Sequence, residues 1–474
     1  MSHQVFAQAS PISIGGKSLF TPDPITSKNV RQFYSAPQVV KAAIKKLQLA
    51  GFKVHPEGNT SIGISGPVDV FEKAFHVSLQ KVENKKHQSY WINITGKIKG
   101  FINTQGTHFD DVLEGIALTI PSEYYEYPYP PQVNYWHLRL PGDVSLALNA
   151  DKAHRKSVTG KGVRVTLHDS GFYQHPYYQG RGYRYRGLII PPNSINYPKR
   201  DRIGHGTGIA ANLFAISPDC ELSMAVKFVD PVLEFNHAAN MDPKPDVISC
   251  SWGYEVSGAI LEPYQQTLAA AVADAVSRNI IVVFAAGNGH HAFPGQHPDV
   301  ISVGGAYITQ QNTLEASSYA SSFESLVYTG RKVPDVCGLV GEAPRGVYLM
   351  LPAPPNSLED EEFSDNPWIM NDAYPEIDNT ATDDGWIVAS GTSSAAPQIA
   401  GICALMREKD PDITPQAAKQ QLMNSAVDVK TGNSSEGTGS ETASEGIDLA
   451  TGAGLADAWN AVRTMDPVLE PNTN

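Results

Sequence analysis

Hydrophobic and polar positions follow two different patterns in the two parts of this chain. Near the N-terminus, residues 37–50 carry apolar side chains at helical spacing, and the pattern stops at Gly51. Around this helix the sequence predicts strands at 4–7, 52–55, 61–65 and 77–82 and a second helix at about 67–75. This β-α-β-β-α-β order predicts a small α+β, ferredoxin-like unit with both helices on one face of an antiparallel sheet.

The second part contains continuous apolar runs. Residues 163–168 and 280–285 are rich in β-branched side chains, as in buried parallel strands that are covered on both faces. This pattern predicts an α/β fold. A chain of 474 residues is long for one core, so two domains are expected. Tyr124–Pro131 is rich in Pro and Tyr and suits neither a helix nor a central strand. The predicted domains are 1–120 and 136–474, with a linker at 121–135.

The run Gly-Thr-Ser-Ser-Ala-Ala-Pro at 391–397 is the most specific chemical signal. It places Ser393 at the start of a predicted helix, beside backbone N–H groups that have no partner within the helix. Those donors can receive the negative charge that forms when a hydroxyl attacks a carbonyl. A helix start built from small residues is the structural alternative. Ser393 is therefore the candidate nucleophile.

Three upstream motifs supply the groups that such a nucleophile needs. Asp169 ends a strand and precedes a Ser-Gly turn, His205 lies between glycines at a helix start, and Asn288 follows a buried strand. Read singly, the Asp and Asn motifs are equally consistent with ordinary turns, and a lone His is often structural. Together they are candidates for an orienting carboxylate, a general base and an oxyanion donor.

The four motifs, in the order Asp169, His205, Asn288, Ser393, resemble those of subtilisin-like serine peptidases. The resemblance covers about residues 136–465. It implies a three-layer α/β domain with a mostly parallel central sheet. It also implies a serine endopeptidase in which Asp169, His205 and Ser393 form the triad and Asn288 and the Ser393 N–H form the oxyanion hole.

The resemblance also implies an extended peptide substrate, bound between two strand edges by backbone hydrogen bonds. The residues expected at these edges are Ser251, Trp252, Gly253, Ala286 and Gly287. The bulk of Trp252 predicts that smaller or flatter substrate side chains are accepted there.

The first 120 residues resemble the pro-region of subtilases, and the amino-acid sequence at 49–75 is closer to the pro-region of sedolisins. They carry 13 Lys and Arg against 8 Asp and Glu, whereas residues 121–474 carry 23 against 41. A net +5 unit beside a net −18 unit is expected to dock with electrostatic help. The basic residues are scattered and form no clustered basic stripe, which disfavours nucleic acid or membrane as a partner. The prediction is a pro-domain, cleaved by the enzyme itself within about 121–136, that restrains a zymogen.

An acidic insertion is predicted at about 352–385, where ten acidic residues occur without any Lys or Arg. It would gate the cleft, favour basic substrates or bind Ca²⁺, and a solvated loop is equally consistent with it. No metal site is assigned. Four widely spaced cysteines, no visible signal peptide and no transmembrane run predict a cytoplasmic protein. The chain's expected partners are a polypeptide substrate, its own pro-domain and a regulatory protein.

Two alternatives to a constitutive peptidase stay open. One is a catalytically silent relative that keeps the fold to bind peptides or to act as a scaffold. The other is a zymogen that becomes active only after a partner removes the pro-domain.

Overall fold

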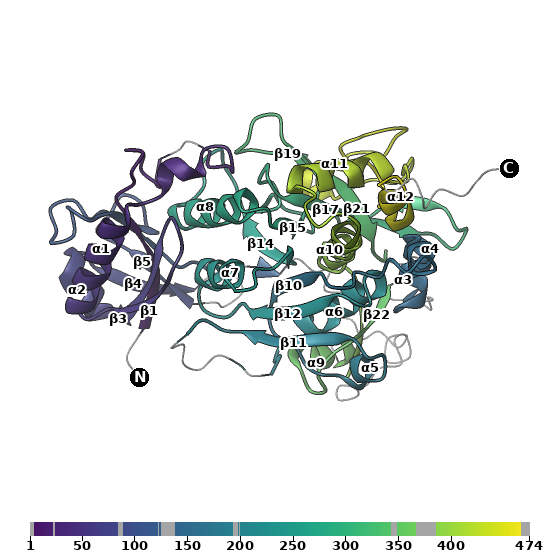
Figure 1. The fold of residues 1–474 in the computed structure, drawn as a ribbon. Helices are drawn as coiled ribbons and strands as arrows, with labels where there is room; N and C mark the ends of the chain where they lie inside the picture. Colours follow the sequence, from purple (N-terminus) through teal and green to yellow (C-terminus); the bar gives the residue numbers. More distant parts are fainter. Residues whose placement is uncertain are drawn as a thin grey trace.

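The computed structural model describes residues 4–21, 24–83, 89–121, 123–124, 138–192, 198, 200–342, 348–365 and 385–465. Residues 4–121, here called the N-terminal unit, form a five-stranded antiparallel sheet in the order β2-β3-β1-β7-β6, with a separate β4–β5 hairpin (Figure 1). Its elements are β1 (Gln4–Pro11), η1 (Val30–Phe33), α1 (Pro37–Leu49), β2 (Lys53–Glu57), β3 (Ile62–Pro67), α2 (Val68–Phe75), β4 (Leu79–Glu83), β5 (Ser89–Asn93), β6 (Phe101–Ile102) and β7 (Leu113–Leu118).

The expected helices and the first three strands are present in this unit, but the last strand differs. The strand predicted at 77–82 forms as β4, which pairs with β5 and not with the sheet. Only Leu79 of β4 is buried, whereas β7 is buried along nearly its whole length. The more apolar β7 therefore takes the place beside β1.

The larger unit is built on an eight-stranded sheet, in which β11, β12, β10, β13, β15 and β17 are parallel neighbours. β21 is parallel to β17, and β18 is antiparallel to it. The strands of this sheet are β10 (Arg164–Asp169), β11 (Arg184–Ile189), β12 (Glu221–Val226), β13 (Val247–Cys250), β15 (Ile281–Ala285), β17 (Ile301–Ile308), β18 (Leu314–Ala316) and β21 (Val336–Leu339).

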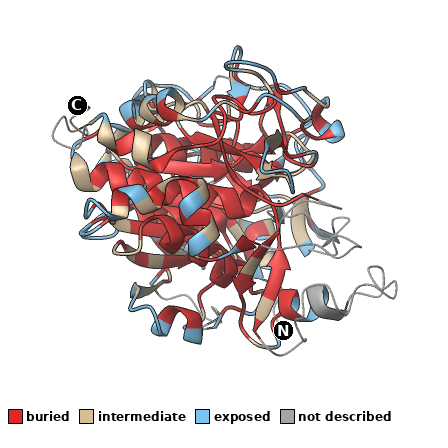
Figure 2. Cartoon of the chain, turned by 90° about the vertical axis from the view of Figure 1, so that its right-hand side faces the viewer, coloured by how far each residue is buried: buried red, intermediate tan, exposed pale blue. Residues whose placement is uncertain are grey.

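Helices cover both faces of this sheet, and side chains alternate between two cores. On β15, Val283 joins the core that contains α6 and α10, whereas Val282 and Phe284 join the core that contains α7 and α8. Figure 2 shows the central sheet and its helices largely buried. The helices are α3 (Gly142–Ala147), α4 (Ala150–His154), α5 (Pro176–Gln179), α6 (His205–Ile216), α7 (Pro231–Ala239), α8 (Pro263–Ser277), α9 (Leu358–Asp365), α10 (Thr392–Lys409), α11 (Pro415–Ser425), η2 (Glu436–Thr438) and α12 (Ala458–Arg463).

Short strands complete the larger unit and connect it to the N-terminal unit. The three-stranded sheet β16-β14-β8 lies at the substrate edge predicted above, and β23-β22-β9 lies beside α6. The remaining strands are β8 (Glu123–Tyr124), β9 (Leu138–Arg139), β14 (Trp252–Glu255), β16 (Ala292–Phe293), β19 (Phe323–Glu324), β20 (Lys332–Val333), β22 (Leu349–Pro352) and β23 (Trp386–Ala389). Most of the predicted linker, and residues 366–384 of the predicted insertion, lie outside the described residues.

The N-terminal unit packs against α7 and α8, with α1 and α2 on the opposite side of its sheet (Figure 1). Gln8 of β1 donates from Nε2 to Asp230 Oδ2 at the start of α7 (2.7 Å), and Asn59 donates from Nδ2 to Asp274 Oδ1 on α8 (2.9 Å). Tyr34 also donates its hydroxyl to Asp274. The two units therefore share polar contacts, and an apolar cluster that includes Leu19, Phe33 and Ala270 also joins them.

All four cysteines are buried and free. Within the described residues, no helix is both long enough and apolar enough to cross a membrane.

Candidate active site

Three neighbouring parallel strands bring the predicted site residues together. β10, β13 and β15 lie side by side, with His168 opposite Cys250 and Cys250 opposite Phe284. Asp169, Ser251 and the segment that leads to Asn288 therefore follow at the same edge of the sheet. Adjacent strands lie about 4.8 Å apart, so groups at these three ends are within side-chain reach of one another.

Asp169 and His205 form the first pair at this edge. His205 is the first residue of α6, and its Nδ1 lies 2.5 Å from Asp169 Oδ1. Both side chains are almost completely buried. Burial lowers the pKa of His205, which keeps the imidazole neutral at pH 7. Burial also raises the pKa of Asp169, and the Ser170 N–H and the ammonium of Lys227 oppose that rise.

Ser393 and Ser251 form a second, reciprocal pair. Ser393 Oγ donates to the Ser251 carbonyl (3.1 Å), and Ser251 Oγ donates to the Ser393 carbonyl (2.8 Å). In an unbroken helix the Ser393 carbonyl would accept the N–H of residue 397, but Pro397 has none. Pro397 lies inside α10 and leaves this carbonyl available to Ser251.

Asn288 and Thr392 form the third pair. Asn288 Oδ1 accepts the backbone N–H of Thr392 (3.1 Å) and its hydroxyl (3.0 Å). These bonds fix the amide so that Nδ2 is the donor left over. Nδ2 is buried and has no hydrogen-bond partner among the described residues. A buried donor without a partner is costly in a folded protein, which favours a role toward a ligand or intermediate.

The start of α6 is held by residues that sequence reasoning missed. Asp201 is buried, and its carboxylate accepts the N–H of Gly204 (3.0 Å) and both the N–H and the hydroxyl of Thr207 (2.9 and 2.7 Å). Ser170 Oγ accepts the N–H of Gly206 (2.8 Å). An acidic side chain four residues before His205 was the available signal, because carboxylates stabilise helix N-termini.

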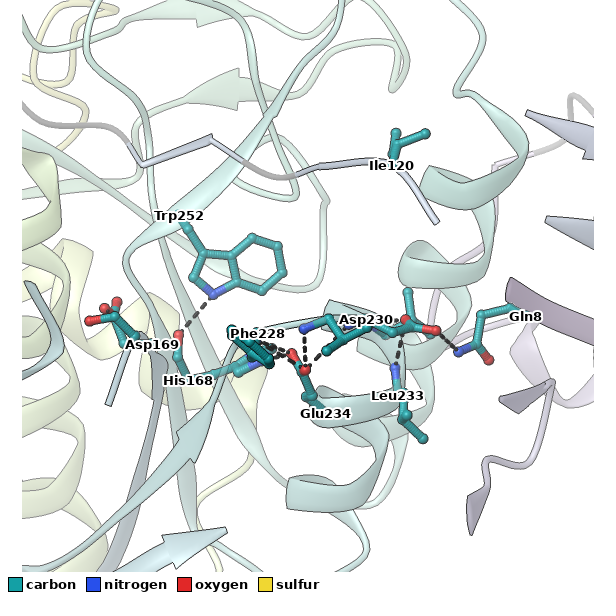
Figure 3. A network of polar contacts seen from close by, with 12 residues as sticks. Gln8, Ile120, His168, Asp169, Phe228, Asp230, Leu233, Glu234 and Trp252 are labelled. Carbon is teal, nitrogen blue, oxygen red and sulfur yellow. Dashed lines mark hydrogen bonds and ion pairs between the residues drawn. The ribbon is translucent and has the colours of Figure 1, made fainter. Parts of the chain in front are cut away.

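Behind Asp169 lies a buried polar network (Figure 3). Trp252 is fully buried and donates its indole N–H to the His168 carbonyl (2.8 Å). His168 Nε2 lies 3.7 Å from the carboxylate of Glu234. That carboxylate also accepts the N–H groups of Phe228, Val229 and Asp230, at 2.8 to 3.2 Å. The network links the strand that carries Asp169 to the loop at the start of α7.

The predicted substrate edge carries an extended segment of the chain itself. β8 runs antiparallel to β14, with Tyr124 opposite Trp252 and Glu123 opposite Gly253. By contrast, the backbone N–H groups of Ala286 and Gly287 donate to Val303 O (2.9 Å) and Thr392 Oγ1 (3.3 Å). Substrate contacts of Ala286 and Gly287, and a subsite narrowed by the Trp252 ring, stay predictions.

No metal centre is evident in the part of the chain that the structure describes, where no three His, Cys, Asp or Glu side chains are grouped as ligands. Calcium binding stays a prediction.

The fold agrees with comparisons to known proteins. The structure of fervidolysin from Fervidobacterium pennivorans, a keratinolytic enzyme related to subtilisin, superposes with a TM-score of 0.54 at 16% identity, over 98% of this chain and 61% of that one. The fold is therefore the subtilisin-like α/β fold. Residues 160–454 match the model of the subtilase family, and the chain belongs to that family.

Relatives with known names support the same assignment. The serine protease AprX of Bacillus subtilis is 29% identical over 305 residues, which cover 57% of this chain and 62% of that protein. The subtilisin-like protease PopC of Myxococcus xanthus is 26% identical over 310 residues, 58% of each chain. The matched region thus spans about three fifths of these relatives.

Proposed function

We propose that this chain is a serine endopeptidase that hydrolyses peptide bonds through an acyl-enzyme. Ser393 attacks the scissile carbonyl, His205 accepts the hydroxyl proton, and Asp169 orients the imidazole and stabilises its charged form. His205 then protonates the leaving amine. In the second half of the reaction, water gives a proton to His205 and attacks the acyl-enzyme ester, which releases Ser393. The Nδ2 of Asn288 and the Ser393 N–H stabilise the oxyanion.

The observation that carries this proposal is the convergence of three bonded pairs on adjacent strand ends. Asp169–His205 supplies an oriented base, Ser251–Ser393 holds the nucleophile, and Thr392–Asn288 aims a partnerless amide N–H₂. A structural role explains each pair alone but does not explain a buried donor left unpaired next to a serine at a helix start.

We further propose that the chain is made as a zymogen whose N-terminal unit is its pro-domain. The support is the position of β8, which follows that unit directly and pairs with the β14 edge beside Ser251. An extended segment on this edge occupies the place where an extended substrate would add a strand. Cleavage within about 121–136 would free the edge.

Labelling with a fluorophosphonate serine probe tests both parts. The full chain is labelled before and after limited proteolysis at residues 121–136, with Ser393→Ala as the control, and the N-termini of both chains are sequenced. We expect strong labelling after proteolysis, none in Ser393→Ala, and a processed N-terminus in the wild type only. Absence of labelling after proteolysis would identify a catalytically silent relative. The same N-terminus in both chains would exclude self-processing.

A further inference from the structure

The beginning of the acidic insertion lies against the loop that leads into His205. The N–H of Leu358 donates to the Arg202 carbonyl (3.0 Å), and the N–H of Glu359 donates to the Ile203 carbonyl (2.9 Å). These are the first two residues of α9. The N-terminal N–H groups of a helix have no partner within it, so α9 satisfies two of them on the backbone that carries the proposed base.

Packing at this contact is close. Gly204 has a φ of 106°, and a Cβ atom there would lie 2.7 Å from Ser357 Oγ and 3.3 Å from Glu359 Cβ. On the other side of the loop, the guanidinium of Arg200 donates to the Pro355 carbonyl (3.1 Å). The loop at 200–204 is therefore held from both ends by residues of the insertion.

The same insertion also leads into the nucleophile. β22 and β23 flank it and pair antiparallel, with Leu349 opposite Ala389. Ala389 ends β23, and Ser393 follows four residues later. One stretch of chain thus contacts the loop of the base through α9 and continues into the helix of the nucleophile through β23.

Charge does not explain this arrangement. Glu359 is 6% exposed. Burial, followed by the charges of Asp201 and Asp169, raises its pKa well above the usual range. Burial therefore disfavours an anion at this position beside His205. The contact acts through its geometry.

We propose that residues 355–359 form a positioning clamp, in which the backbone N–H groups of Leu358 and Glu359 and the Pro355 carbonyl fix the 200–204 loop and thereby the imidazole of His205 relative to Ser393. This inference rests on the triad roles proposed above. In this proposal the described start of the insertion holds His205 in place and has no role in the choice of substrate.

Leu358 offers a matched pair of variants. Its side chain is 60% exposed and belongs to no part of the site, and proline is tolerated in the first turn of a helix. Leu358→Pro removes the N–H that bonds to Arg202, whereas Leu358→Ala keeps it. We expect Leu358→Pro to lower kcat about tenfold, because small misplacements of reacting groups are costly, with KM within about twofold. Leu358→Ala is expected to match the wild type.

The measurement is hydrolysis of a fluorogenic peptide by the activated full chain, with active sites titrated by the fluorophosphonate. A folded Leu358→Pro variant with wild-type kcat would overturn the clamp, as would a change confined to KM. Should Leu358→Pro not fold, Arg200→Ala removes an exposed side chain, its bond to Pro355 and its contact with the Tyr173 ring. It is expected to lower kcat about two- to threefold, and an unchanged kcat overturns the proposal.

Ser393→Ala separates this inference from the function on which it rests. Retained hydrolysis in Ser393→Ala means that the proposed triad is wrong. Loss of hydrolysis in Ser393→Ala together with full activity in Leu358→Pro means that only the clamp is wrong.

Discussion

Helix α1 of the N-terminal unit and helices α6 and α10 of the larger unit bury very different shares of their surface. In α1, only Ala43 and Leu47 are fully buried, and the opposite face is exposed to solvent. In α6 all twelve residues are buried, and in α10 burial extends from Thr392 to Arg407. A helix on one sheet face needs one apolar stripe, whereas a helix enclosed by a sheet and other helices has no polar face. Periodicity therefore reveals the first kind, and motifs are needed for the second.

The largest expected effect tests whether the two units are separate cores. Phe71 is fully buried in the N-terminal unit, where its ring contacts Phe52 (centroids 4.8 Å apart). Phe71→Ala should cost about 3–5 kcal/mol of unfolding free energy in that unit. Calorimetry of the Ser393→Ala chain should show one transition lowered and the other unchanged.

Leu49→Ala is the control for this variant, because Leu49 is 78% exposed and its truncation should cost less than about 0.5 kcal/mol. Equal shifts of both transitions in Phe71→Ala would show that the two units unfold as one.

The next largest effect is expected in the candidate active site, at Asn288. Asn288→Ala removes the partnerless Nδ2 and should lower kcat by about 10²–10³-fold, the range that the equivalent loss has in subtilisin, with little change in KM. Thr392→Val removes one of the two bonds that orient Asn288 and should have a smaller effect in the same direction. Full activity of Asn288→Ala in steady-state peptide hydrolysis would exclude its oxyanion role.

The smallest effect is expected at the contact between the units. Gln8→Glu places a carboxylate 2.7 Å from the position of Asp230 Oδ2, and like charges at an interface are unfavourable. We expect about tenfold weaker docking of the N-terminal unit and therefore faster fluorophosphonate labelling of the full chain.

Gln8→Met is the matched control for this contact. It removes the hydrogen bond to Asp230, and the one that Gln8 Oε1 accepts from Ser61, without adding charge, so it should have a smaller effect on docking. Slower labelling of Gln8→Glu than of the wild type would contradict an inhibitory role of this contact.

Local signals in the sequence predicted much of the fold and of the candidate site. The Asp169–His205 pair and the position of Ser393 follow from motifs, and α1 follows from periodicity. The choice between β4 and β7 as the partner of β1 depends on pairing over a hundred residues, which no local pattern reveals. For the insertion, composition predicted acidity. The contact of Leu358 and Glu359 with the loop before His205 joins residues far apart in the sequence, and no local sequence pattern predicts it.

Pro397 shows how one missing hydrogen in the backbone can set stability against activity. Replacing Pro397 with alanine would supply the backbone N–H that α10 lacks at this position. A change of this kind would be chosen to raise thermal stability. The new N–H at position 397 would then compete with the Ser251 hydroxyl for the Ser393 carbonyl. The variant would thus gain a more regular helix α10 and weaken the hydrogen bond that ties Ser393, the proposed nucleophile, to Ser251 at the end of β13.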